Sequence, residues 1–207
     1  MTEQPAKSRA YLQVVLMFAI VAAPLALGFF MFPGSQEERD QLLGELGTTN
    51  HGTFLLPMTP IAGLALADED GNPWRWQDHK PKWRMLIPSA TTCTDECAEL
   101  LYTTRQVHVR LGKYTHRIER LLVATDGELA PDYRQSLKTD HPNLTVLQAD
   151  GNALAQWLAP TNSPWQPGQG KVILVDPEGM AMMVYDHSHK GNDMLEDLNH
   201  LLKYSPE

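Results

Sequence analysis

The sequence predicts a mixed α/β domain, in which helices flank a central mixed sheet, behind a single N-terminal transmembrane helix. Three observations lead to this prediction. An uncharged apolar run extends from Tyr11 to Phe32. Beyond residue 60, short strand-like runs alternate with amphipathic helical runs, a layout typical of a sheet covered by helices on both faces. The chain's two cysteines also stand together where one strand-like run gives way to a helical one.

The apolar run is long enough to cross a bilayer, whose core of roughly 30 Å needs about 20 apolar residues. Lys7 and Arg9 precede it and acidic residues follow it. Because positively charged flanks stay in the cytoplasm, we expect a cytoplasmic tail over residues 1–10 and the rest of the chain in the periplasm. The predicted location is therefore the inner (plasma) membrane, with a single pass over 11–32.

A cleaved signal peptide is the competing interpretation of the same run. Signal peptides have an apolar region of only about 7–15 residues, followed by a cleavage site of small residues. Here the run is longer and ends in bulky Phe29-Phe30-Met31-Phe32. The pattern favours an uncleaved anchor, and both interpretations place the cysteines in an oxidising compartment.

The rest of the chain divides into a linker and one folded domain. Residues 33–60 are predicted as the linker, with a short polar helix over Gln36–Leu46 and then a stretch rich in Gly, Thr and Pro. Residues 61–207 are predicted as the domain. Strands are expected at 61–66, 74–76, 82–88, 118–124, 144–147, 171–175 and 180–185, and helices at 94–111, 131–139, 152–158 and 193–204.

Composition and charge exclude some classes of function. A net charge of −8 argues against a nucleic-acid partner, which requires a basic surface. Two cysteines are too few for a disulfide scaffold or for a zinc site of four cysteines. The two close cysteines instead suggest one working pair.

That pair is Cys93 and Cys97, in the pattern C-x-x-x-C. Cys93 is predicted to precede a helix, where unpaired backbone N–H groups and the helix dipole favour a thiolate. Cys97 then falls in the first turn, so that the two sulfurs can close a disulfide or hold a thiophilic metal. The alternative is two unrelated small core residues, which the shared five-residue window makes the weaker interpretation.

A reactive cysteine at the first strand-to-helix junction of such a layout is the thioredoxin arrangement. The chain adds an N-terminal anchor, a strand–Asp-Gly–strand hairpin, an Ala124-Thr-Asp126 strand end and a late Val175-Asp-Pro-Glu-Gly179 turn. In this order of motifs it resembles the SCO family of membrane-anchored, thioredoxin-fold proteins that serve cytochrome c oxidase assembly. The resemblance implies that Cys93 and Cys97 exchange thiols and disulfides and also bind copper. It implies cytochrome c oxidase subunits or other assembly factors as partners.

Two departures set the chain apart from the SCO pattern. Ala98 follows the second cysteine where the family usually has proline, and the segment Pro164–Gly170 lacks the family's copper histidine. The chain therefore resembles a divergent branch without that ligand. His187 and His189 are the candidate replacements, because they follow a strand predicted to neighbour the strand that leads to Cys93. The alternative is that both are solvated loop histidines without a metal.

Three functions follow from these observations. The first is a membrane-anchored assembly factor that handles the thiols or the copper of an oxidase. The second is a thiol–disulfide oxidoreductase acting on protein disulfides, against which the C-x-x-x-C spacing argues, since the extra residue moves the second sulfur around the helix. The third is a binding module in which the Cys93–Cys97 bond is only structural.

Overall fold

A computed structural model describes residues 5–31 and 50–205, which belong to two separate compact units. The first unit contains helix α1 (Pro5–Met31). Within it, Tyr11–Phe29 is long and apolar enough to cross a membrane. The polar helix expected at Gln36–Leu46 lies outside the described residues.

The second unit, from residue 50 to residue 205, is a sheet of eight strands with helices on both faces. The strands are β1 (Thr53–Pro60), β2 (Leu66–Ala67), β3 (Pro73–Trp74), β4 (Trp83–Ser89), β5 (Ile118–Ala124), β6 (Leu144–Gln148), β7 (Val172–Val175) and β8 (Met180–Tyr185). The helices are α3 (Asp95–Arg110), α4 (Pro131–Asp140), α5 (Gly151–Leu158) and α6 (Gly191–Tyr204). Most elements lie close to their predicted bounds, and the mixed α/β prediction is confirmed.

The strand order is β1-β8-β7-β4-β5-β6-β2-β3. Strands β4, β5 and β6 are parallel, whereas β7 runs antiparallel beside β4 and β8 runs antiparallel beside β7. The carboxyl ends of β4, β5 and β6 therefore meet at one edge, where the loop that carries the cysteines leaves β4. Chain segments far apart in sequence come together at that edge.

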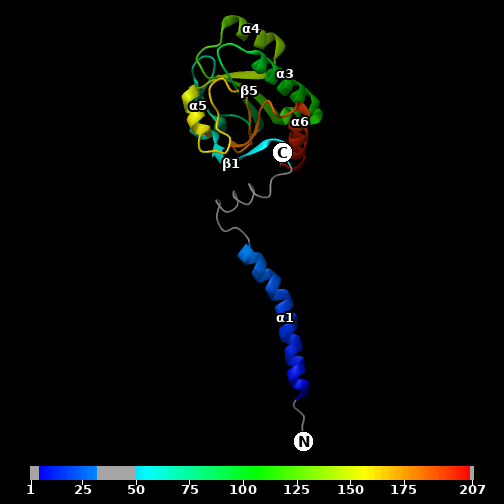
Figure 1. The fold of residues 1–207 in the computed structure, drawn as a ribbon. Helices are drawn as coiled ribbons and strands as arrows, with labels where there is room; N and C mark the ends of the chain where they lie inside the picture. Colours follow the sequence, from blue (N-terminus) through cyan, green and yellow to red (C-terminus); the bar gives the residue numbers. More distant parts are fainter. Residues whose placement is uncertain (1–4, 32–49, 206–207) are drawn as a thin grey trace. The chain divides into compact units, whose positions relative to one another are not determined.

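Alternate residues of the central strands fill two cores, one on each face. On β4, Met85 and Ile87 face the core that α3, α4 and α6 cover, and Leu86 faces the core under α5. Because every residue of β4 is buried, its sequence reads as a continuous apolar run rather than an alternating one. Figure 1 shows α5 and α6 on opposite sides of the sheet.

Strand β1 corrects the predicted linker boundary. Residues 53–60 were predicted as part of the linker, but they pair with β8 from Thr53↔Val184 to Pro60↔Met180. Proline is tolerated in this strand because β1 lies at the sheet edge, where one side needs no hydrogen-bond donors. The folded unit therefore includes β1 and does not start at residue 61.

The predicted strand at 61–66 is also largely wrong. Ile61–Gly63 forms a 3-10 turn, and only Leu66 and Ala67 pair as a strand, with β3 and β6. The N–H of Ile61 donates to the carbonyl of Gly179, so this segment is held by the β7–β8 turn instead of a neighbouring strand. Ile61, Leu64 and Leu66 are buried in the core under α5, which explains why the run resembles a strand in sequence.

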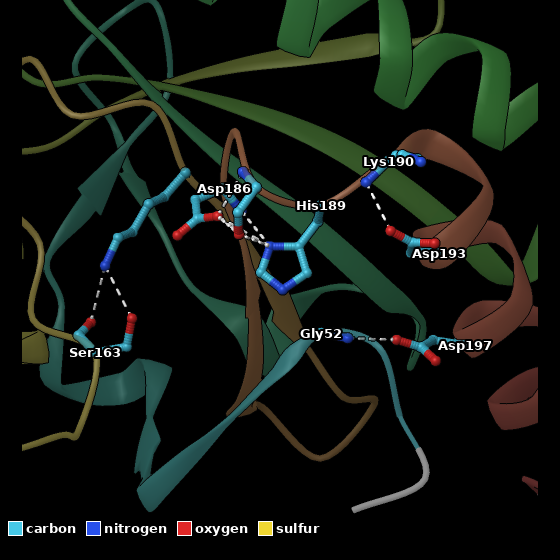
Figure 2. A network of polar contacts seen from close by, with 9 residues as sticks. Gly52, Ser163, Asp186, His189, Lys190, Asp193 and Asp197 are labelled. Carbon is cyan, nitrogen blue, oxygen red and sulfur yellow. Dashed lines mark hydrogen bonds and ion pairs between the residues drawn. The ribbon is translucent and has the colours of Figure 1, made fainter.

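A buried carboxylate joins the start of β1 to α6. Asp197 accepts hydrogen bonds from the backbone N–H groups of His51 and Gly52 and from the Tyr185 hydroxyl, at 2.9–3.1 Å. Figure 2 shows the Gly52–Asp197 contact. Burial and the charge of Asp197 raise the pKa of Tyr185, so that its hydroxyl remains a donor.

Candidate functional site

The two cysteines lie where β4 passes into α3, as predicted. Thr94 caps the helix, and its hydroxyl accepts a hydrogen bond from the N–H of Cys97 at 3.3 Å. Cys93 therefore precedes the helix and Cys97 lies in its first turn. The two form a disulfide with their Cα atoms 5.3 Å apart.

Both cysteines are half-buried and pack against the core on the α3 side of the sheet. Their neighbours Thr92, Thr94 and Asp95 are exposed. The disulfide thus packs against apolar core side chains on one side and is bordered by polar residues at the surface. A half-buried position at a helix N-terminus suits a sulfur that must be both reachable and able to carry negative charge.

Tyr133, on α4, contacts the sulfur of Cys97. Its hydroxyl oxygen lies 3.3 Å from the Cys97 Sγ atom and 3.1 Å from the Ser89 Oγ atom. Ser89 Oγ is 3.6 Å from the same sulfur and donates to the carbonyl of Ala90 at 3.1 Å. Burial raises the pKa of Tyr133, and the hydrogen bond with Ser89 only partly opposes that rise. The phenol therefore stays protonated beside the disulfide.

Sequence reasoning missed Tyr133 and Ser89. Ser89 ends β4, and Tyr133 belongs to the helix after β5, far along the chain from Cys97. The one available signal was the position of the two residues in the chain. Ser89 ends one parallel strand and Tyr133 comes after the next, and the carboxyl ends of these strands meet at the same edge. Nothing in the local sequence indicates that the Tyr133 side chain points toward the sulfur.

A small cavity of about 50 Å³ adjoins Cys97. Its lining includes Trp165 and Gly170, which belong to the segment where the SCO pattern places its copper histidine. A Cβ atom added to Gly170 would lie 2.5 Å from a carboxylate oxygen of Glu96, so the Glu96 side chain packs against the Gly170 backbone. The structure therefore brings this segment to the cysteine pair, but it supplies no imidazole.

The start of that segment is anchored by a buried lysine. The Nζ atom of Lys171 donates to both oxygens of Ser163 and to the carbonyl of Pro164, at 2.8–3.3 Å. Lys171 is only 4% exposed. Burial lowers its pKa, and the nearby charge of Asp186 partly opposes that shift. These contacts fix the start of the loop that lies beside Cys97.

The candidate histidines lie elsewhere. Strand β7 separates β8 from β4, so the prediction that their strand neighbours the active-site strand is wrong. His187 is exposed, and His189 Nδ1 lies 3.0 Å from a carboxylate oxygen of Asp186 (Figure 2). Burial raises the pKa of Asp186, but hydrogen bonds from Ser188 and His189 outweigh it and lower that pKa to about 2.

Neither histidine therefore joins the cysteine pair. Among residues 5–31 and 50–205, no three side chains of the types His, Cys, Asp and Glu are grouped to hold a metal ion. At this edge the structure brings the hydroxyl groups of Ser89 and Tyr133 against the Cys97 sulfur of the disulfide.

Comparisons with known proteins fit this geometry. A family model described as a transmembrane-like, thioredoxin-like, C-terminal domain matches residues 83–205, which is more than half of the chain. The chain belongs to this family. The matched region runs from β4 through α6 and includes the cysteine pair and Tyr133. No curated protein matches the sequence.

Solved structures share the fold. Apo Sco1 from Thermus thermophilus is 24% identical, with a TM-score of 0.55, covering 74% of this chain and 97% of that one. Copper-bound yeast Sco1 is 16% identical, with a TM-score of 0.55, covering 77% and 97%. A thiol:disulfide interchange protein from a Bacteroides species is 16% identical, with a TM-score of 0.50, covering 70% and 88%. The resemblance to the SCO proteins is confirmed at the level of the thioredoxin-like fold.

Proposed function

We propose that this chain is a membrane-anchored, periplasmic thioredoxin-fold protein that cycles Cys93 and Cys97 between disulfide and dithiol during the assembly of cytochrome c oxidase. The observation that carries the proposal is the half-buried disulfide at the start of α3, with a protonated hydroxyl group against one of its sulfurs. The partners are thiols of oxidase subunits or of other assembly factors. The fold shared with Sco1 proteins and with a thiol:disulfide interchange protein supports this function.

In the exchange step, covalent bonds form and break only between sulfur atoms. A partner thiolate attacks the Sγ atom of Cys93, the Cys93–Cys97 bond breaks, and Cys97 leaves as a thiolate. A second partner thiolate then attacks the mixed disulfide and releases Cys93. The partner loses two electrons and becomes a disulfide, while this protein gains them as a dithiol. The reverse sequence reduces a partner disulfide, and the relative reduction potentials decide the direction.

Copper is the second candidate, as cargo rather than as a resident cofactor. Two sulfurs, one just before α3 and one in its first turn, suit copper(I), which prefers soft ligands. Copper-bound yeast Sco1 has the same fold. The donor set fits only in part, since the segment that borders the pair carries Trp165, Gln169 and Gly170 in place of an imidazole. We therefore propose that any copper(I) is held by Cys93 and Cys97 alone.

A redox titration tests the exchange function. The full-length protein in detergent should show a two-electron potential between about −270 and −120 mV, the range of known exchange proteins. The fraction of reduced thiol, measured by alkylation and mass spectrometry in glutathione buffers, gives this potential. A value below about −300 mV would instead support a purely structural disulfide.

A fusion experiment tests the proposed topology. Alkaline phosphatase joined after Glu207 should be active in bacterial cells, because Lys7 and Arg9 keep the N-terminal tail in the cytoplasm. A β-galactosidase fusion at the same position is the matched control and should be inactive. Active β-galactosidase with inactive phosphatase would place the cysteines in the cytoplasm and contradict the periplasmic assignment.

A further inference from the structure

Two hydroxyl groups lie against the Cys97 sulfur. Tyr133 Oη lies 3.3 Å from this sulfur and Ser89 Oγ lies 3.6 Å from it. Ser89 is only 5% exposed, and Tyr133 packs against the core on the α3 side. Both groups are therefore held in place by the fold before any thiolate forms.

The Ser89 and Tyr133 hydroxyl groups have one proton each, and the direction in which each proton points decides their roles at the Cys97 sulfur. Ser89 donates to the carbonyl of Ala90, so its oxygen is available to accept the Tyr133 proton. A disulfide sulfur is a weak acceptor, so in the oxidised protein the phenol donates its hydrogen bond to the Ser89 oxygen instead. A thiolate is a charged and much stronger acceptor. When the disulfide opens, the same proton can turn to the Cys97 sulfur without any movement of α4.

We propose that Tyr133 is a catalytic residue of the exchange step, whose hydroxyl donates a hydrogen bond to the Cys97 sulfur as it leaves and then holds it as a thiolate. Ser89 supports it by accepting a hydrogen bond from the phenol in the oxidised protein. In the reduced protein the Ser89 proton can turn from the Ala90 carbonyl to the sulfur 3.6 Å away. No proton is transferred, because the phenol keeps its proton throughout. This role rests on the proposed function, in which Cys93 is attacked and Cys97 leaves.

The charges around Cys97 make such a donor useful. The N-terminus of α3 favours a thiolate at this position. Asp95 and Glu96, in the same first turn, oppose it, and Glu96 also borders the cavity beside the sulfur. A neutral hydroxyl donor stabilises the thiolate locally and adds no charge. Of the hydroxyl groups of Ser89 and Tyr133, that of Tyr133 lies closer to the sulfur.

The substitution Tyr133→Phe tests the proposal, since it removes the hydroxyl and keeps the ring. In full-length protein carrying Cys93→Ser, the pKa of the Cys97 thiol should rise by about one unit or more, the size expected for losing a hydrogen bond to a charged group. Ultraviolet absorbance of the thiolate across pH measures it. Ser89→Ala should raise the pKa in the same direction by less. Tyr102→Phe, at an exposed tyrosine on α3, is the matched control and should leave it unchanged.

A second readout follows the exchange step itself. Reduced glutathione should open the Cys93–Cys97 bond of the Tyr133→Phe protein at least about threefold more slowly than the bond of the wild-type protein. The reason is that a leaving thiol of higher pKa leaves more slowly. A failure of the proposed exchange function can be distinguished from a failure of the proposed role of Tyr133. If glutathione does not open the wild-type bond, the proposed function fails, while the thiol pKa still decides the role of Tyr133. An unchanged Cys97 pKa in both Tyr133→Phe and Ser89→Ala, with unchanged melting temperatures, would overturn this role.

Discussion

Cys93→Ser is expected to abolish copper(I) binding by the reduced full-length protein. Wild-type protein should bind one copper(I) in competition with a chromophoric chelator, because two thiolates at the start of α3 supply soft donors. Removing one sulfur leaves a single donor. The loss of affinity should exceed about a hundredfold, more than the tenfold to hundredfold cost of losing an outer partner of a metal ligand. Copper(II), which prefers nitrogen and oxygen donors, should bind poorly.

The histidine pair provides the control for this experiment. The double variant His187→Ala/His189→Ala should bind copper(I) as wild type does, since β7 separates the strand before these residues from β4. Loss of binding in that variant would mean that one of these histidines reaches the sulfurs in the reduced protein. Failure of the wild-type protein to compete for copper(I) would rule out copper handling and leave thiol exchange or a structural disulfide.

Asp197→Ala is expected to lower the free energy of unfolding by about 3 kcal/mol. The carboxylate accepts hydrogen bonds from two backbone N–H groups, of His51 and Gly52, and from the buried Tyr185 hydroxyl. Its removal leaves the two N–H groups without this acceptor and leaves the Tyr185 hydroxyl with only the weak sulfur acceptor of Met183. Each buried unsatisfied group costs about 1–3 kcal/mol. Urea unfolding of the full-length protein in detergent, followed by tryptophan fluorescence, measures the change in midpoint at constant slope.

Glu196→Ala is the matched control, one residue away. Glu196 is exposed and contacts His51 at the surface, so its removal should change stability by less than about 1 kcal/mol. Equal effects of the two substitutions would show that Asp197 contributes no more than a surface charge. The start of β1 would then be held to α6 by apolar packing alone.

The elements around the cysteines could be predicted because their signals are local. The continuous apolar run of β4, the start of α3 and the place of Cys93 between them are all encoded within a few neighbouring residues. Burial of β4 on both faces keeps its run apolar, and the helix follows from the absence of Gly and Pro. The apolar run from Tyr11 is likewise a local signal.

Other elements were predicted wrongly because their structure depends on distant partners. The Pro- and Thr-rich stretch at 53–60 resembles a linker, but β8 offers it an open edge, where proline is tolerated. The apolar run at 61–66 resembles a strand, but the turn at Gly179 and the core under α5 hold most of it in other conformations. In both cases the packing outweighs the local preference.

The sequence by itself determined the fold class, the candidate anchor and the position of Cys93 and Cys97 at a helix start, because each depends on residues close together in the chain. Only the tertiary structure decided what surrounds Cys97. Tyr133 and Trp165 come from segments far from the cysteines, and the order of the strands brings them to the same edge of the sheet. The same strand order puts β7 between β4 and the strand that leads to His189. Contacts between distant segments follow from the packing of the whole domain and not from any local pattern.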